Sequence, residues 1–312
     1  MFDAPKLLRN YPTMPLDADR LSQFHWLVIE EEFELDPRPE ARATPFMFVD
    51  MSQDFGEIEP HLGRFPPAVE SAVFFLLLAP WEDWSTMPEV DWRGFRIPWI
   101  YTVDDDLFVR PARPPIADSL TLEPWIVENN SGEEFELERP SKLRLEDRAM
   151  PALQHLTDAK WNELQAARAT TLFETPIVHF LVRAFLADGM DEVMAHMTAI
   201  EAALGLEADY RRKPKTDLHR QMPPTQRVAA RLGGVLADAK ASKDYRDLFE
   251  LRSAFVHGRG GIHKVSTPQR LLARSLARRA VQALVVRASQ SLGTRDQEMA
   301  DLLNKGAVLL KP

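Results

Sequence analysis

The chain has 312 residues, of which 45% are hydrophobic and 27% are charged, a balance that excludes a disordered or fibrous protein. It contains no cysteine, so disulfides, thiolate metal sites, iron–sulfur clusters and cysteine nucleophiles are all excluded. The longest apolar run, residues 72–79, is far shorter than the roughly 20 residues of a membrane span, and we find no secretory signal. We therefore expect a cytoplasmic protein with no membrane partner.

The formal charge of −9 is distributed unevenly along the chain. Residues 1–150 contain 14 basic and 30 acidic residues, a net charge of −16, whereas the remainder has a net charge of +7. Proline and tryptophan follow the same division, with 17 of 24 prolines and six of seven tryptophans before residue 150. A length about twice that of a usual domain also favours two domains, which we place at residues 1–149 and 150–312.

The first half has the pattern of short strands. Residues 24–35, 46–51, 69–79 and 95–103 are rich in aromatic or β-branched residues and are bounded by Pro, Gly or Asp. Prolines recur throughout this half and exclude long helices there. We predict an acidic, β-rich N-terminal domain of unknown role.

After residue 150 the apolar residues recur with helical spacing. The pattern predicts helices near 153–164, 175–185, 191–204, 225–239, 243–257 and 267–291. The expected fold class is therefore α+β with two domains, in which a β-rich N-terminal domain is followed by an all-α bundle.

Most motifs of nucleotide, metal or hydrolase sites are missing from the sequence. It has no P-loop, no His-Glu-x-x-His and no Gly-x-Gly-x-x-Gly. Asp104–Asp106 could bind a divalent cation, but an acidic turn between strands is the commoner origin of such a run. We predict no metal and no cofactor.

The most informative segment is Tyr245–Gly258, which is helical by pattern and has a glycine suited to ending the helix. It contains Arg252 and, five residues later, His257. This spacing alone is not specific, because Arg20 and His25 repeat it at the start of an expected strand. The surrounding sequence distinguishes the two pairs.

Residues 251–258, Leu-Arg-Ser-Ala-Phe-Val-His-Gly, resemble the Arg-(polar)-x3-His-Gly signature of HEPN domains (higher eukaryotes and prokaryotes nucleotide-binding). The flanking blocks 199–204 and 226–233, together with the long arginine-bearing helix after the motif, resemble in order the Apea-like HEPN group. The resemblance covers about residues 172–291 and includes nothing before residue 150.

The resemblance implies an all-α HEPN-like bundle that pairs as a homodimer. Many catalytic members of the family are metal-independent RNA endonucleases that leave a 2′,3′-cyclic phosphate, and such proteins often serve in defence or stress responses. Histidine is suited to carry a proton near neutral pH, and the forked, permanently charged guanidinium of arginine is suited to stabilise a phosphoryl group. By resemblance, Arg252 and His257 are the catalytic residues.

Two further residues are candidates for supporting this pair. Ser253 matches the polar position of the signature and could orient Arg252 or a phosphate, although a plain helix serine needs no such role. Glu201 lies at the edge of an apolar helical stripe and could pair with Arg252 or Arg227; an ordinary edge carboxylate is the alternative.

Basic residues around the motif are candidates for contact with the RNA backbone. Arg259, His263 and Lys264 follow the motif in a glycine-rich segment, and Arg270, Arg274 and Arg278 form one stripe of the following helix. Solvated surface charge is the alternative for all six.

We predict a metal-independent endoribonuclease of HEPN type that cleaves RNA by attack of the 2′-OH and does not act on DNA. The alternative is a non-catalytic module that dimerises or binds nucleotide or RNA, with an N-terminal domain that binds a ligand or a protein.

Overall fold

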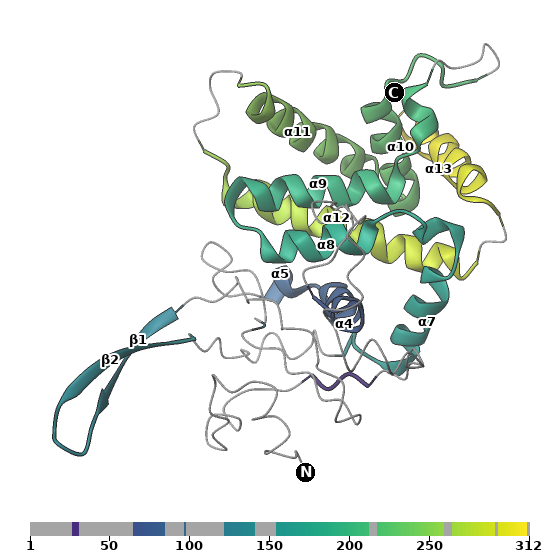
Figure 1. Cartoon of the computed structure of the whole chain (residues 1–312). Helices are drawn as coiled ribbons and strands as arrows, with labels where there is room; N and C mark the ends of the chain where they lie inside the picture. Colours follow the sequence, from purple (N-terminus) through teal and green to yellow (C-terminus); the bar gives the residue numbers. More distant parts are fainter. Residues whose placement is uncertain are drawn as a thin grey trace, which may run out of the picture. The chain divides into compact units, whose positions relative to one another are not determined.

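The computed structural model describes residues 27–30, 65–84, 97, 122–140, 154–211, 217–258, 264–290 and 293–310 (Figure 1). The chain divides into two compact units, one comprising Met1–Val69 with Arg96–Ser141 and the other Glu70–Phe95 with Lys142–Pro312. Each unit is described by itself. In the described part of the chain, no helix combines the length and apolar character needed to cross a membrane.

The described part of the first unit contains an antiparallel hairpin of β1 (Leu122–Glu128) and β2 (Glu134–Pro140). The turn between them is built on Asn129, whose side-chain oxygen accepts hydrogen bonds from the backbone N–H groups of Ser131 (2.9 Å) and Glu133 (3.0 Å). Gly132 has a φ of 79°, a conformation that glycine adopts without strain.

The prediction of a β-rich N-terminal domain is wrong, because the described residues are mostly helical and their only sheet is this two-stranded hairpin. The expected strand at 69–79 is helix α4 (Pro67–Leu77). A continuous apolar run fits a buried helix as well as a buried strand, and Pro67 occupies the first helical turn, where proline is favourable. Residues 27–30 of the first expected strand are not in a strand, and those at 46–51 and 95–103 lie outside the described residues except for residue 97.

The second unit is helical, and the six helices expected after residue 150 are all present, although their ends differ by up to about five residues. The sequence analysis missed α5, α13 and two short 3-10 helices. In chain order, the elements after α4 are α5 (Trp81–Trp84), α7 (Asp158–Arg168), η2 (Thr171–Phe173), α8 (Ile177–Leu186), α9 (Gly189–Leu204), η3 (Glu207–Tyr210), α10 (Pro224–Leu236), α11 (Ala239–Val256), α12 (Thr267–Ala288) and α13 (Arg295–Leu309).

Helix α12 forms the centre of this unit and contacts α7, α8, α9, α10 and α11 (Figure 1). Its side chains Leu276, Val281 and Leu284 are fully buried. It begins with a capping box, in which Ser266 and Gln269 satisfy each other's backbone N–H groups. The core therefore surrounds a helix whose start is clearly specified by the sequence.

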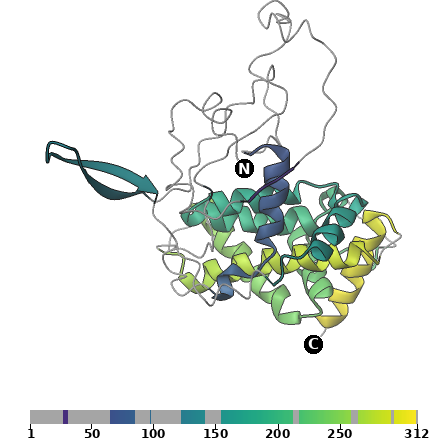
Figure 2. The same cartoon turned by 90° about the horizontal axis from the view of Figure 1, so that it is seen from below.

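Helix α4 packs on α7 (Figure 2). The rings of Phe75 and Trp161 meet edge to face with centroids 5.2 Å apart, and the Arg168 guanidinium donates to the Ser71 hydroxyl over 2.7 Å. Residues 70–84, which precede the boundary placed at residue 150, thus belong to the same unit as the later helices.

Two glycines allow α10 and α13 to approach closely. A Cβ on Gly306 would lie 1.7 Å from the carbonyl oxygen of Ala230, and a Cβ on Gly234 would lie 2.3 Å from that of Leu302. Both distances are far inside van der Waals contact, so neither position accepts a larger residue without moving a backbone.

Candidate functional site

Helix α11 carries the Arg-x4-His segment and ends at it. The Asp238 side chain caps the start by accepting from the Lys240 N–H, and His257 is the C-cap residue. The His257 N–H donates to the Ser253 carbonyl over 3.0 Å, and Gly258 follows with a φ of 60°. The prediction that Gly258 ends the helix is confirmed, and the reason is the left-handed conformation that this end requires.

Arg252 is held by a carboxylate from a neighbouring helix. Its Nη1 donates to Oε1 of Glu201 on α9 over 2.7 Å, and the guanidinium lies 5.7 Å from the centre of the Phe249 ring. The two side chains are 26% and 23% exposed, so the pair is at the edge of the core and still reaches solvent. One ion-pair bond uses only one of the five N–H donors of arginine.

The sequence left Arg252 and Arg227 open as partners of Glu201, and in the structure the partner is Arg252. Arg227 is buried elsewhere: it donates to Asp217 Oδ2 over 2.7 Å and to the backbone carbonyls of Met222 and His219. Glu201 thus lies at the edge of its helical stripe, as expected, and is paired there with Arg252.

The carboxylate of Glu201 is held in an unfavourable environment. Burial raises its pKa above the ordinary value, and the charge of Arg252 offsets only part of that rise. The buried hydroxyl of Tyr245 also interacts with this carboxylate. Burial, together with the charge of Glu201, raises the pKa of Tyr245 far above its usual range, so Tyr245 remains a neutral O–H.

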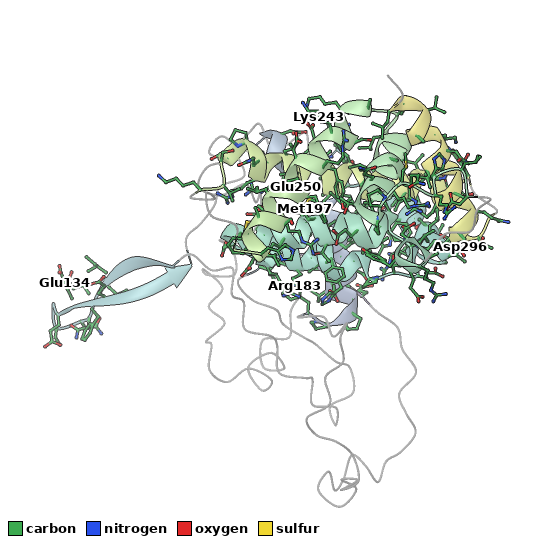
Figure 3. All side chains as sticks on the ribbon, turned by 90° about the horizontal axis from the view of Figure 1, so that it is seen from above. Glu134, Arg183, Met197, Lys243, Glu250 and Asp296 are labelled. Carbon is green, nitrogen blue, oxygen red and sulfur yellow. The ribbon has the colours of Figure 1, made fainter. Side chains whose placement is uncertain are left out.

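His257 and Lys264 are exposed, and Ser253 is partly buried. The side chains of Phe255 and Val256, directly before His257, are 50% and 55% exposed, so an apolar surface adjoins the histidine. Figure 3 shows the side chains of α11, on which the labelled Lys243 and Glu250 are also exposed. Arg259 and His263 lie outside the described residues.

The expected basic stripe on α12 is mostly buried. Arg270 is 23% exposed and donates to Glu192 Oε2 over 3.2 Å. Arg274 and Arg278 are 1% and 8% exposed, and each is paired with a buried carboxylate. The Arg274 Nη2 donates to Glu192 Oε2 over 3.0 Å, and the Arg278 Nε donates to Glu82 Oε1 over 2.7 Å. Contact of these two arginines with RNA phosphate is therefore ruled out, because both guanidinium groups are buried in the core.

A cleft of about 270 Å³ adjoins Glu201 on the side of η3. Arg231 holds η3, which forms one wall of the cleft, against the end of α9. Its Nη2 donates to Asp209 Oδ1 over 2.9 Å, and its Nη1 donates to the Leu204 carbonyl over 2.9 Å. The exposed ring of Tyr210 lies at the end of the same short helix. The residues lining the cleft are Thr175, Pro176, Phe180, Thr198, Glu201, Ala202, Gly205, Leu206, Glu207, Asp209, Tyr210, Pro224 and Val228.

Tyr210, Tyr245 and Phe249 were not among the residues predicted from the sequence. The last two could have been found, because Tyr245, Phe249 and Arg252 follow the i, i+4, i+7 spacing of one helix face. Tyr210 has no such signal, since it joins the site only through the fold of η3 against α9 and α10.

Among the residues described by the structure, no group of three or more His, Cys, Asp or Glu side chains could hold a metal ion. Comparison of the chain with protein-family models, with curated proteins and with solved structures finds no significant match. A functional interpretation therefore depends on the local motif and on the geometry around Arg252.

Proposed function

We propose that the chain is a metal-independent endoribonuclease of HEPN type that acts as a homodimer. The observation that carries this proposal is the arrangement at the end of α11. Arg252 is fixed at the edge of the core by Glu201 and Phe249, and an exposed His257 follows it as the C-cap residue of the same helix.

These two side chains suit cleavage by internal attack. The 2′-oxygen of a ribose forms a bond to the adjacent phosphorus while the bond from phosphorus to the 5′-oxygen breaks. A general base accepts the 2′-OH proton, and a general acid delivers a proton to the departing 5′-oxygen. A 2′,3′-cyclic phosphate remains on the RNA. His257 is the proton carrier, and Arg252 stabilises the charge that develops on the phosphoryl oxygens.

One copy of α11 does not direct both groups to the same point. Positions five residues apart in a helix diverge by about 140° and are separated by about 7.5 Å along the axis. Two copies of the chain that meet at this helix end would bring Arg252 of one copy toward His257 of the other. The exposed Phe255 and Val256 supply apolar area for such a contact.

The first test is an RNA cleavage assay in the presence of EDTA. Purified protein should cut single-stranded RNA and leave the DNA of the same sequence intact, because DNA lacks the 2′-OH. His257→Ala and Arg252→Ala should each lower the rate by about 10²-fold or more. Arg246→Ala is the matched control, because Arg246 is an exposed arginine on the same helix.

The proposal fails if cleavage requires magnesium or if it survives His257→Ala at the wild-type rate. Product analysis gives a second criterion, because a 3′-hydroxyl end instead of a cyclic phosphate would contradict 2′-OH attack.

The exposed Phe255 and Val256 also favour a second candidate function, a non-catalytic dimerisation module. Replacement of both by serine should convert a dimer to a monomer in sedimentation velocity under either candidate function. Wild-type protein that dimerises but never cleaves RNA would select the module over the nuclease.

A further inference from the structure

We propose that the cleft between α9 and η3 binds an unpaired guanine base of the RNA, next to the phosphate held by Arg252. This inference rests on the proposed function and extends it by naming the base that the site recognises. It is carried by the size of the cleft, the chemistry of its walls and its position beside Glu201.

The cleft has room for one flat ring system. Its volume of about 270 Å³ is just below the range of roughly 300–1,000 Å³ that is typical of sites for drug-sized ligands. Its walls combine Pro176, Phe180, Leu206 and Val228, which provide apolar surface for the faces of a ring. A base fits these dimensions, whereas a folded polymer does not.

Tyr210 provides a stacking surface at the cleft. Its side chain is 76% exposed although it lines the cleft, so its ring is available to a ligand. Stacking of an unpaired base on an aromatic ring is a general means by which proteins hold single-stranded RNA. The buried pair of Arg231 and Asp209 fixes η3 and therefore the position of this ring.

The charged groups that line the cleft favour binding of a nucleobase over binding of a phosphate. The ionisable groups of the lining are Glu201, Glu207, Asp209 and Tyr210, none of which is cationic at neutral pH. Glu207 is paired with Arg211, Asp209 with Arg231 and Glu201 with Arg252, so Glu201 is the carboxylate of the lining that contacts the candidate catalytic arginine. A carboxylate accepts hydrogen bonds and repels a phosphate.

The two threonine hydroxyls of the lining are already used within the protein. Thr175 donates to the Ala202 carbonyl and Thr198 donates to the Met194 carbonyl, each over less than 3 Å. The cleft therefore favours a ligand edge that donates hydrogen bonds to a carboxylate. Guanine has two adjacent donors, N1–H and the N2 amino group, which match the two oxygens of Glu201. Oε1 already accepts from Arg252, but each carboxylate oxygen has two acceptor sites, so both oxygens can still accept from a base. Uracil presents one donor there, and adenine presents an amino group beside an acceptor.

The experiment measures binding separately from cleavage. The probes are fluorescein-labelled 12-nucleotide RNAs of oligouridine in which one central residue is G, A or C, and the protein is the full chain carrying His257→Ala. The RNA with G should bind at least tenfold more tightly than that with A in fluorescence anisotropy. Tyr210→Ala should weaken this binding by about tenfold, and Tyr210→Phe should retain it, because the phenylalanine ring still stacks.

Glu201→Gln should remove the preference for G over A, because an amide presents a donor as well as an acceptor. Leu218→Ala is the matched control, since Leu218 is 89% exposed and does not line the cleft. Its binding should equal that of the parent protein.

The outcomes separate this inference from the proposed function. Equal binding of the three RNAs, or a Tyr210→Ala protein that binds as well as its parent, would overturn the base-binding cleft even if wild-type protein cleaves RNA. A preference for G that depends on Tyr210, in a chain whose wild type never cleaves RNA, would support the cleft and reject the nuclease. Absence of any RNA binding would overturn both.

Discussion

Helix α9 carries two glutamates that each pair with an arginine, and the two pairs differ in their surroundings. Glu192, near the start of the helix, pairs with Arg274, and both side chains are 1% exposed. Glu201, near its end, pairs with Arg252, and both are about one-quarter exposed. The same chemical pair thus occurs once in the core and once at the edge of a cleft.

The pKa of the carboxylate shifts in opposite directions in the two pairs. Burial by itself would raise the pKa of Glu192, but the neighbouring His196, together with the hydrogen bonds and the charge of Arg274, outweighs burial and lowers the pKa to about 2. At Glu201 burial outweighs the charge of Arg252, and the pKa is raised. The core pair favours the charged carboxylate, whereas the cleft pair holds it at a cost in free energy, as is common at functional sites.

Removal of the arginine should distinguish the two pairs most strongly. Arg274→Ala removes the closest partner of the buried Glu192, which then keeps only Arg270 and His196 beside it, and should lower the free energy of unfolding by up to about 3–5 kcal/mol. Arg252→Ala should lower it by no more than about 1 kcal/mol, because its pair still reaches solvent. Urea denaturation of both variants measures the difference.

The double variant Glu192→Leu with Arg274→Met is the control for the core pair. It removes both charges and should recover part of the stability lost in Arg274→Ala. Equal losses in Arg252→Ala and Arg274→Ala would show that the two pairs have the same structural role.

Acid should weaken the core pair specifically. The pKa of Glu192 is about 2 in the folded protein, below its ordinary value of 4.5, so its contribution is complete above pH 4.5 and is lost as the pH falls toward 2. A shift of this size corresponds to about 3 kcal/mol of stability. Denaturation curves between pH 6 and pH 2.5 should fall more steeply for the wild type than for Glu192→Gln.

A slope that is equal in the two proteins would contradict the assignment of this acid dependence to Glu192. Glu250→Gln is the matched control, because Glu250 is exposed on α11, and it should leave the slope unchanged.

Glu201→Gln should change the pH dependence of stability less than Glu192→Gln does, and in the opposite direction. Because the pKa of Glu201 is raised in the folded protein, its ionisation costs stability, and this cost appears as the pH rises through that pKa. The variant should therefore gain stability relative to the wild type between pH 4 and pH 8, by no more than about 1 kcal/mol. Thermal unfolding at several pH values measures the change, and a relative loss of stability toward pH 8 would contradict it.

Local sequence signals specified much of the helical unit. The helices that contain the motif blocks were predictable because apolar residues recur at helical spacing and because the boundaries carry local signals such as Gly258 and Pro268. The placement of Arg252 and His257 on one helix that ends at a glycine followed from the same signals.

Two features were not predictable from local pattern. The apolar run in α4 fits a strand or a helix until its packing against Trp161 on α7 is known. Arg274 and Arg278 have the spacing of a solvent-exposed helix face. They are buried because they pair with the buried carboxylates of Glu192 and Glu82, which the local pattern does not reveal. The expected strand at residues 69–79 was wrong for the first of these reasons.

The sequence by itself determined where most of the later helices begin and end and that an arginine and a histidine share the end of α11, because these depend on residues within a few positions of one another. The tertiary structure alone decided that Glu201 is the partner of Arg252 and that Tyr210 stands at the cleft beside it. Glu201 and Arg252 are 51 residues apart, and their pairing depends on the packing of α11 against α9, which no local pattern encodes.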